Sequence, residues 1–152
     1  MAIDPASVAT LLPDTVPMVR TLNLAFLELS LDRAVLRLPD DPLWHNHMGG
    51  PHAGAMFTLG ESASGAIVFA NFGDLMDRAV PLAVECTIRY LRLAMGPVDA
   101  EAVLGRPAAE VVAELDAGTR PEFPVSITIR DGAGQPTGEM SVLWTLRPHR
   151  KA

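Results

Sequence analysis

The residues best suited to chemistry lie between positions 46 and 61, where an amide, an imidazole and a carboxylate follow one another. They are Asn46, His52 and Glu61, with glycines and a proline between the first two. The stretch that leads to the carboxylate is apolar and reads as a helix. Because burying a charged group costs free energy unless something offsets it, a carboxylate in an apolar helix points to a catalytic role.

The expected start of this helix favours a developing negative charge. Pro51 and the glycines around it leave the backbone N–H groups of residues 52–54 without partners inside the helix. Such donors and the helix dipole stabilise the oxyanion that forms when a carbonyl is attacked. Glu61 lies about two turns further on, ~11 Å along the axis, too far to serve the same carbonyl. Chemistry of this kind therefore predicts a dimer, in which an antiparallel copy of the helix brings the partner's Glu61 to this N-terminus.

Glu61 also has a purely structural interpretation. It could lie on a wet stripe of the helix beside Ser62, Ser64 and Gly65, since charged residues are mostly exposed. If it is catalytic, it could act as a general base toward water. It could instead attack the carbonyl directly and form a mixed anhydride. The sequence leaves both routes open.

Three histidines, His45, His47 and His52, raise the question of a metal site. A zinc site needs a third and a fourth ligand at suitable spacing, and the sequence offers no clear set, so we expect histidines satisfied within the loop and no metal. The serines Ser62 and Ser64 do not form the G-x-S-x-G elbow of serine hydrolases. An activated water therefore remains as the nucleophile, alongside the carboxylate itself.

The composition predicts a single globular domain over residues 1–152. Hydrophobic residues make up 49%, and the net charge of −6 argues against a general nucleic-acid binder, which needs clustered Lys and Arg. The one cysteine, Cys86, falls on the apolar face of an expected strand and cannot form an internal disulfide, which suits a reducing compartment. The first residues lack signal-peptide features and no membrane-length apolar span is evident, so we expect a cytoplasmic protein that does not enter a membrane.

Hydrophobic periodicity and turn residues outline the elements that must position these groups. In chain order we expect a short helix over 4–12 closed by Pro13 and Pro17, a hairpin over 22–38, a buried helix from 51 or 52 to 72, a half-buried strand over 84–93, its partner strand over 98–104, a short helix over 107–117 and a hairpin over 125–146. Strands grouped around a helix imply an α+β fold with a mostly antiparallel sheet.

Two arginines, Arg89 and Arg92, stand at the end of the strand expected over 84–93. The planar guanidinium group suits the recognition of phosphate. Each arginine taken singly is equally consistent with a solvated strand face.

The spacing of these groups resembles that of the hotdog-fold thioesterases, in particular the PaaI-type phenylacetyl-CoA thioesterase family. That family has an Asn, a His-Gly-Gly five residues later, and an Asp or Glu in the helix eight residues after the His. Asn46, the segment His52-Ala53-Gly54 and Glu61 hold those places here. The later Cys86–Arg92 stretch, followed by Gly96, is similar to the family's strand that runs into Tyr-Leu-Arg-Pro. The resemblance covers about residues 20–147 and implies a sheet curled around one long central helix.

The resemblance implies a role for each matching residue. Asn46 would orient the water or the base, and His52 would lie near the thioester sulfur or hold the loop. The N–H of Ala53 would polarise the thioester carbonyl, while Gly54 would permit close approach. Glu61 of the partner subunit would be the base or the nucleophile. Arg92, together with Arg89, would lie toward the nucleotide end of coenzyme A.

The function implied is hydrolysis of an acyl- or aryl-CoA by a homodimer or a dimer of dimers. Coenzyme A enters as part of the substrate, and no other cofactor is expected. Three positions depart from the family pattern: Ala53 replaces a glycine, Glu61 replaces an aspartate, and Leu93-Ala94 replaces a proline. Two alternatives stay open, a hotdog hydratase or dehydratase that uses His52, and a non-catalytic acyl-CoA-binding protein.

Overall fold

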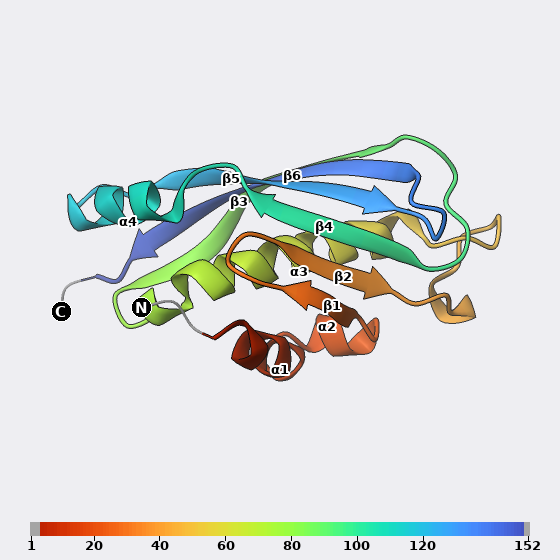
Figure 1. The fold of residues 1–152 in the computed structure, drawn as a ribbon, viewed down its shortest axis with the longest axis horizontal. Coiled ribbons are helices and arrows are strands. Elements are labelled where there is room, and N and C mark those ends of the chain that lie inside the picture. Colours follow the sequence, from red (N-terminus) through yellow and green to blue (C-terminus); the bar gives the residue numbers. More distant parts are fainter. Residues whose placement is uncertain (1–3, 151–152) are drawn as a thin grey trace.

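A computed structural model of the chain describes residues 4–150 and shows one long helix lying along an antiparallel sheet (Figure 1). The predicted domain limits at residues 1 and 152, and most of the segment judged for signal-peptide features, lie outside the described residues. In chain order the elements are α1 (Pro5–Thr15), α2 (Pro17–Thr21), β1 (Ala25–Leu29), β2 (Ala34–Leu38), η1 (Pro42–Trp44), α3 (Ala53–Phe72), η2 (Gly73–Leu75), β3 (Ala79–Tyr90), β4 (Val98–Leu104), α4 (Ala108–Asp116), β5 (Glu122–Arg130) and β6 (Pro136–Pro148).

The six strands form one sheet in the order β1-β2-β4-β5-β6-β3. Both predicted hairpins are confirmed, as the pairs β1–β2 and β5–β6. The predicted pairing of the strand over 84–93 with that over 98–104 is wrong, because β3 pairs with β6 whereas β4 pairs with β2 and β5. Residues 91–97 are therefore a crossing loop rather than a hairpin turn, and they carry the chain from one sheet edge to its centre.

Helix α3 is the buried helix that the sequence predicts. Thirteen of its twenty residues are buried, and its apolar side chains pack on β2, β4 and β5. Gly60 also lies close to Met140 of β6, because a Cβ at this position would lie 2.5 Å from the Met140 sulfur. Ser62, Ser64 and Gly65 are buried as well, so the wet stripe proposed for them does not exist. The expectation that the chain has no apolar span of membrane length is also wrong. By length and composition alone, the helical segment Ala53–Leu75 could cross a membrane, but 61% of its most apolar stretch is buried inside the fold.

Strand β3 forms one edge of the sheet, and no strand within residues 4–150 pairs with its outer side. It begins at Ala79 and ends at Tyr90, so both ends lie earlier in the chain than predicted. The sequence did not indicate the early start because the first residues of the strand carry no alternating pattern. A bulge between Ala83 and Glu85 interrupts its register with β6. The predicted half-buried face is confirmed in its middle, where Cys86 and Ile88 are partly buried against the core, but not at its ends, where Val84 and Tyr90 are each 47% exposed.

The two N-terminal helices lie beside β1 (Figure 1). Asp4 caps α1 as expected, but Pro13 lies inside the helix rather than closing it. The position is in the last turns, where a proline removes only the hydrogen bond to the carbonyl of Ala9. Pro17 then opens α2 instead of ending a helix, because its fixed φ suits a first helical position. The short helix predicted over 107–117 is confirmed as α4.

Candidate active site

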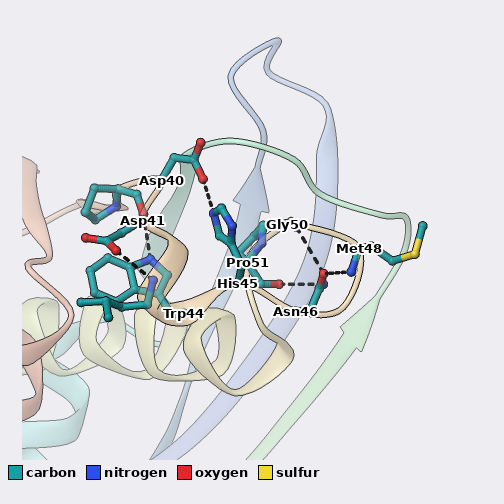
Figure 2. A network of polar contacts seen from close by, with 10 residues as sticks. Asp40, Asp41, Trp44, His45, Asn46, Met48, Gly50 and Pro51 are labelled. Carbon is teal, nitrogen blue, oxygen red and sulfur yellow. Dashed lines mark hydrogen bonds and ion pairs between the residues drawn. The ribbon is translucent and has the colours of Figure 1, made fainter.

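Asn46 organises the loop that leads into α3 (Figure 2). Its Oδ1 accepts hydrogen bonds from the N–H groups of Met48 at 2.8 Å and Gly50 at 3.2 Å. Its Nδ2 donates to the carbonyl of Pro51 at 3.3 Å. The amide is therefore largely engaged in holding the loop, with one Nδ2 proton left to face another group.

The loop is fixed against its neighbours on both flanks. The imidazole of His45 contacts the carboxylate of Asp40 at 2.6 Å, and Trp44 donates its indole N–H to the carbonyl of Pro39 at 2.8 Å (Figure 2). Gly50 passes so close to the carbonyl of Ala94 in the 91–97 loop that a Cβ would collide with that oxygen. These contacts give the residues before α3 a single defined course.

His52 is the N-cap of α3, and its Nδ1 accepts the N–H of Gly54 at 2.9 Å. An accepting Nδ1 leaves the proton of a neutral imidazole on Nε2. Ala53 follows as the first helical residue with a helical backbone, so its methyl group needs no unusual φ. Within residues 4–150 no group accepts a hydrogen bond from the Ala53 N–H. This free donor lies at the positive end of the α3 dipole, where an oxyanion is stabilised.

Tyr90, at the end of β3, ties the sheet edge to this helix start. Its hydroxyl donates to the carbonyl of Ala53 at 2.7 Å, and partial burial raises the pKa of the phenol. The peptide between Ala53 and Gly54 is thus held at both ends, by Tyr90 at its carbonyl and by His52 at its N–H. The sequence analysis missed this role, although Tyr90 stands in the segment whose resemblance was noted.

Glu61 lies half-buried on α3, and burial raises the pKa of its carboxyl group. Across residues 4–150 its carboxylate has no hydrogen bond or ion pair. Burial raises the pKa of the Cys86 thiol on β3, and the negative charges of Glu61 and Glu85 raise it further. The Ser64 hydroxyl donates to the Glu61 carbonyl at 2.7 Å and accepts from the indole of Trp144 at 3.1 Å, which fixes this turn of the helix against β6.

Two clefts flank the start of α3. The first, called the Arg92 cleft, has a volume of about 400 Å³. It is lined by Asn46, Pro51, Ala53, Met56 and residues 90–94. The second, called the Trp44 cleft, has a volume of about 290 Å³. It is lined by Met18, Leu22, Leu43, Trp44, His45, His52, Gly54, Ala55 and Thr58.

The structure brings together most, but not all, of the predicted site residues. Asn46, Ala53 and Arg92 share one cleft, while His52 and Gly54 line the other. Glu61 lines neither, about two turns along α3, as the sequence predicts. Arg89 lies outside both clefts, on β3 opposite Glu139 of β6.

The three histidines of the loop do not form a cluster. His45 contacts Asp40 and His52 caps α3, so these two rings each have a separate local role. Among residues 4–150, no group of three His, Cys, Asp or Glu side chains is placed to hold a metal ion.

The sheet wrapped along α3 defines a hotdog fold, and solved structures share it. A protein of unknown function from Pseudomonas aeruginosa, described as a probable thioesterase, is 27% identical with a TM-score of 0.85, over 98% of this chain and 99% of that one. A thioesterase family protein from Silicibacter pomeroyi is 20% identical with a TM-score of 0.74, over 96% and 100%. A thioesterase from Staphylococcus aureus, solved as a variant, is 18% identical with a TM-score of 0.70, over 88% and 100%.

The sequence itself places the chain in a family. Residues 6–146 match the family described as "Domain of unknown function (DUF4442)", and the chain belongs to it. No curated protein matches the sequence. The resemblance to hotdog thioesterases seen in the motif residues is therefore confirmed at the level of fold and superfamily.

Proposed function

We propose that this protein is an acyl-CoA thioesterase, in which water and an acyl-CoA give a carboxylate and free coenzyme A. The observation that carries the proposal is the half-buried carboxylate of Glu61, which has no partner within residues 4–150 and has a raised pKa. A stable fold gains nothing from such a group, whereas a general base near neutral pH needs a raised pKa. The free Ala53 N–H at the start of the same helix supplies the matching oxyanion donor.

The residues divide the reaction between them. Ionised Glu61 takes a proton from water as the water oxygen bonds to the thioester carbon, and the carbonyl oxygen becomes an oxyanion beside the Ala53 N–H. When the tetrahedral intermediate collapses, the C–S bond breaks and the thiolate leaves, taking up a proton to become the thiol. His52, whose Nε2–H is set by its cap bond, is available as a donor to that sulfur. In the alternative route the carboxylate attacks directly, and water then cleaves the mixed anhydride.

Because Glu61 and the Ala53 N–H of one chain lie about 12 Å apart along α3, the proposal requires a second copy. Strand β3 is a twelve-residue edge whose outer side has no pairing partner in the described part of the chain, and it exposes Val84 and Tyr90. Long unprotected edges are templates for pairing with another chain. Two β3 edges related by a two-fold axis would place the α3 helices antiparallel and bring the partner subunit's Glu61 toward this N-terminus.

The Arg92 cleft is the proposed path of the coenzyme A arm. Arg92 lines it and Arg89 lies nearby on β3, so guanidinium groups are available for the phosphates. The proposal needs no other cofactor and no metal. It includes a cytoplasmic location, with which the free thiol of Cys86 is consistent.

Two experiments test the proposal. Free-thiol release from short, long and aryl acyl-CoAs should occur with the wild-type protein and fall by orders of magnitude in Glu61→Gln. Tight binding of acyl-CoA without any thiol release would favour the binding-protein alternative. Sedimentation should show a dimer that Val84→Lys weakens, whereas the matched Val103→Lys on the central strand β4 should not. A monomer at all concentrations would remove the shared site.

A further inference from the structure

The two clefts are lined by consecutive residues in the first turn of α3. Ala53 lines the Arg92 cleft and the next residue, Gly54, lines the Trp44 cleft. A thioester whose carbonyl oxygen sits at the Ala53 N–H has two arms that leave the reacting carbon in different directions. Each cleft is therefore placed to take one arm.

The walls of the Trp44 cleft are mostly apolar. Met18 of α2 and Leu22, which follows that helix, line it together with Trp44 and Ala55. The indole of Trp44 is held in place by its hydrogen bond to the carbonyl of Pro39. This side of the helix start therefore presents a fixed apolar surface, as sites for apolar ligands do.

The charges around the Trp44 cleft are unfavourable for a nucleotide. Within residues 4–150 no lysine or arginine lines it, and the His45 imidazole in its wall is in contact with the Asp40 carboxylate. A second carboxylate, Asp41, caps η1 directly beside the cleft by accepting the N–H of Leu43. Phosphate groups would be repelled there, whereas the other cleft carries Arg92.

We propose that the Trp44 cleft binds the acyl group of the substrate and that this group is uncharged, apolar and of medium length. The inference rests on the proposed hydrolysis of acyl-CoA. A volume of about 290 Å³ holds roughly nine or ten carbon atoms if each needs about as much space as a water molecule, ~30 Å³. It also exceeds the roughly 150 Å³ that accommodates a benzene ring, so a single-ring aryl group fits as well. Longer chains would project beyond Leu43 into solvent.

Binding measured by calorimetry in the Glu61→Gln background tests the cleft without turnover. Affinity for butanoyl- to hexadecanoyl-CoA should rise by up to about fourfold for each buried methylene and then level off near ten carbons. Met18→Trp, which narrows the cleft, should move this plateau to shorter chains and weaken decanoyl-CoA about tenfold while leaving butanoyl-CoA nearly unchanged. Met18→Ala should move the plateau to longer chains. Met76→Trp, an exposed methionine on another surface, is the matched control and should have no effect.

Leu93→Trp in the Arg92 cleft distinguishes binding of the coenzyme A arm from binding of the acyl arm. It should weaken all acyl-CoAs and free coenzyme A by a similar factor and leave the plateau where it was. The inference is overturned if Met18→Trp leaves the chain-length profile unchanged, or if Leu93→Trp moves the plateau instead. A wild-type protein that shows the expected profile but releases no thiol would refute the proposed hydrolysis and leave the cleft assignment intact.

Discussion

Replacing Asn46 by alanine tests whether this side chain holds the loop that positions the start of α3. The substitution removes the acceptor for the N–H groups of Met48 and Gly50 and the donor to the carbonyl of Pro51. A hydrogen bond of this kind contributes ~0.5–1.5 kcal/mol net, so the two shorter bonds together contribute about 1–3 kcal/mol. For a chain of this size the melting temperature should fall by about 2–12 °C, at ~2–4 °C per kcal/mol.

Asn46→Asp is the matched variant for this prediction. It keeps an acceptor for both N–H groups and loses only the 3.3 Å bond to Pro51, so it should cost less than about 1 kcal/mol. Thermal unfolding followed by circular dichroism measures both variants at one protein concentration. If the alanine variant melts with the wild type, or the aspartate variant is equally destabilised, Asn46 does not organise the loop.

Further predictions concern Glu61, Gly50 and Tyr90. Because burial raises the pKa of Glu61 and the base must be ionised, kcat/KM should rise with pH along a limb above the ordinary value of 4.5. Because the pKa of Glu61 is raised in the folded state, the folded protein is stabilised while Glu61 is protonated and loses this stability as pH rises through the folded-state pKa. Glu61→Gln should therefore have a higher melting temperature than the wild type at neutral pH and the same melting temperature below pH 4.5. A wild type that is more stable than this variant at neutral pH would contradict the prediction. Gly50→Ala should lower the free energy of unfolding by about 1–3 kcal/mol in chemical denaturation, because the added Cβ collides with the Ala94 carbonyl. A denaturation midpoint equal to that of the wild type would show that the loop moves to accommodate the methyl group without cost. Tyr90→Phe should lower kcat about two- to tenfold with KM unchanged, through loss of the hydrogen bond to the Ala53 carbonyl; a rise in KM alone would assign Tyr90 to substrate binding.

The elements with a clear local pattern could be predicted from the sequence. The β1–β2 and β5–β6 hairpins follow from alternating residues and turn residues, and helix α3 follows from an unbroken run of small and apolar residues. The pairing of β3 with β6 could not be predicted in this way. Its partner comes from a distant part of the sequence, and the Met95–Pro97 segment reads equally well as a tight turn or as part of a crossing loop.

The site was predicted more completely in its residues than in their contacts. The types and spacing of Asn46, His52 and Glu61 carry the motif, and the sequence alone places the carboxylate two turns from the helix start. The bond from Tyr90 to the Ala53 carbonyl joins a strand end to a helix start, and it depends on how β3 lies over α3. No local pattern encodes such a contact.

Ala53→Pro provides a clean removal of the proposed oxyanion donor. Proline lacks the N–H but fits the first position of a helix, and His52 before it has φ −60° and ψ 142°, the extended conformation that a residue before proline adopts. The variant should therefore fold like the wild type and lose thiol release. A fully active Ala53→Pro protein would show that another group stabilises the oxyanion.

The most direct measurement of a site shared between subunits is thiol release from a refolded equimolar mixture of Glu61→Gln and Ala53→Pro chains. Each variant alone should be nearly inactive, because every site lacks either the base or the donor. In a two-fold dimer, half of the mixed population would be heterodimers with one intact site of two, so about one quarter of wild-type activity should return. A mixture as inactive as its components, with heterodimers shown to be present, would contradict the account, because Glu61 would then not act across the subunit interface.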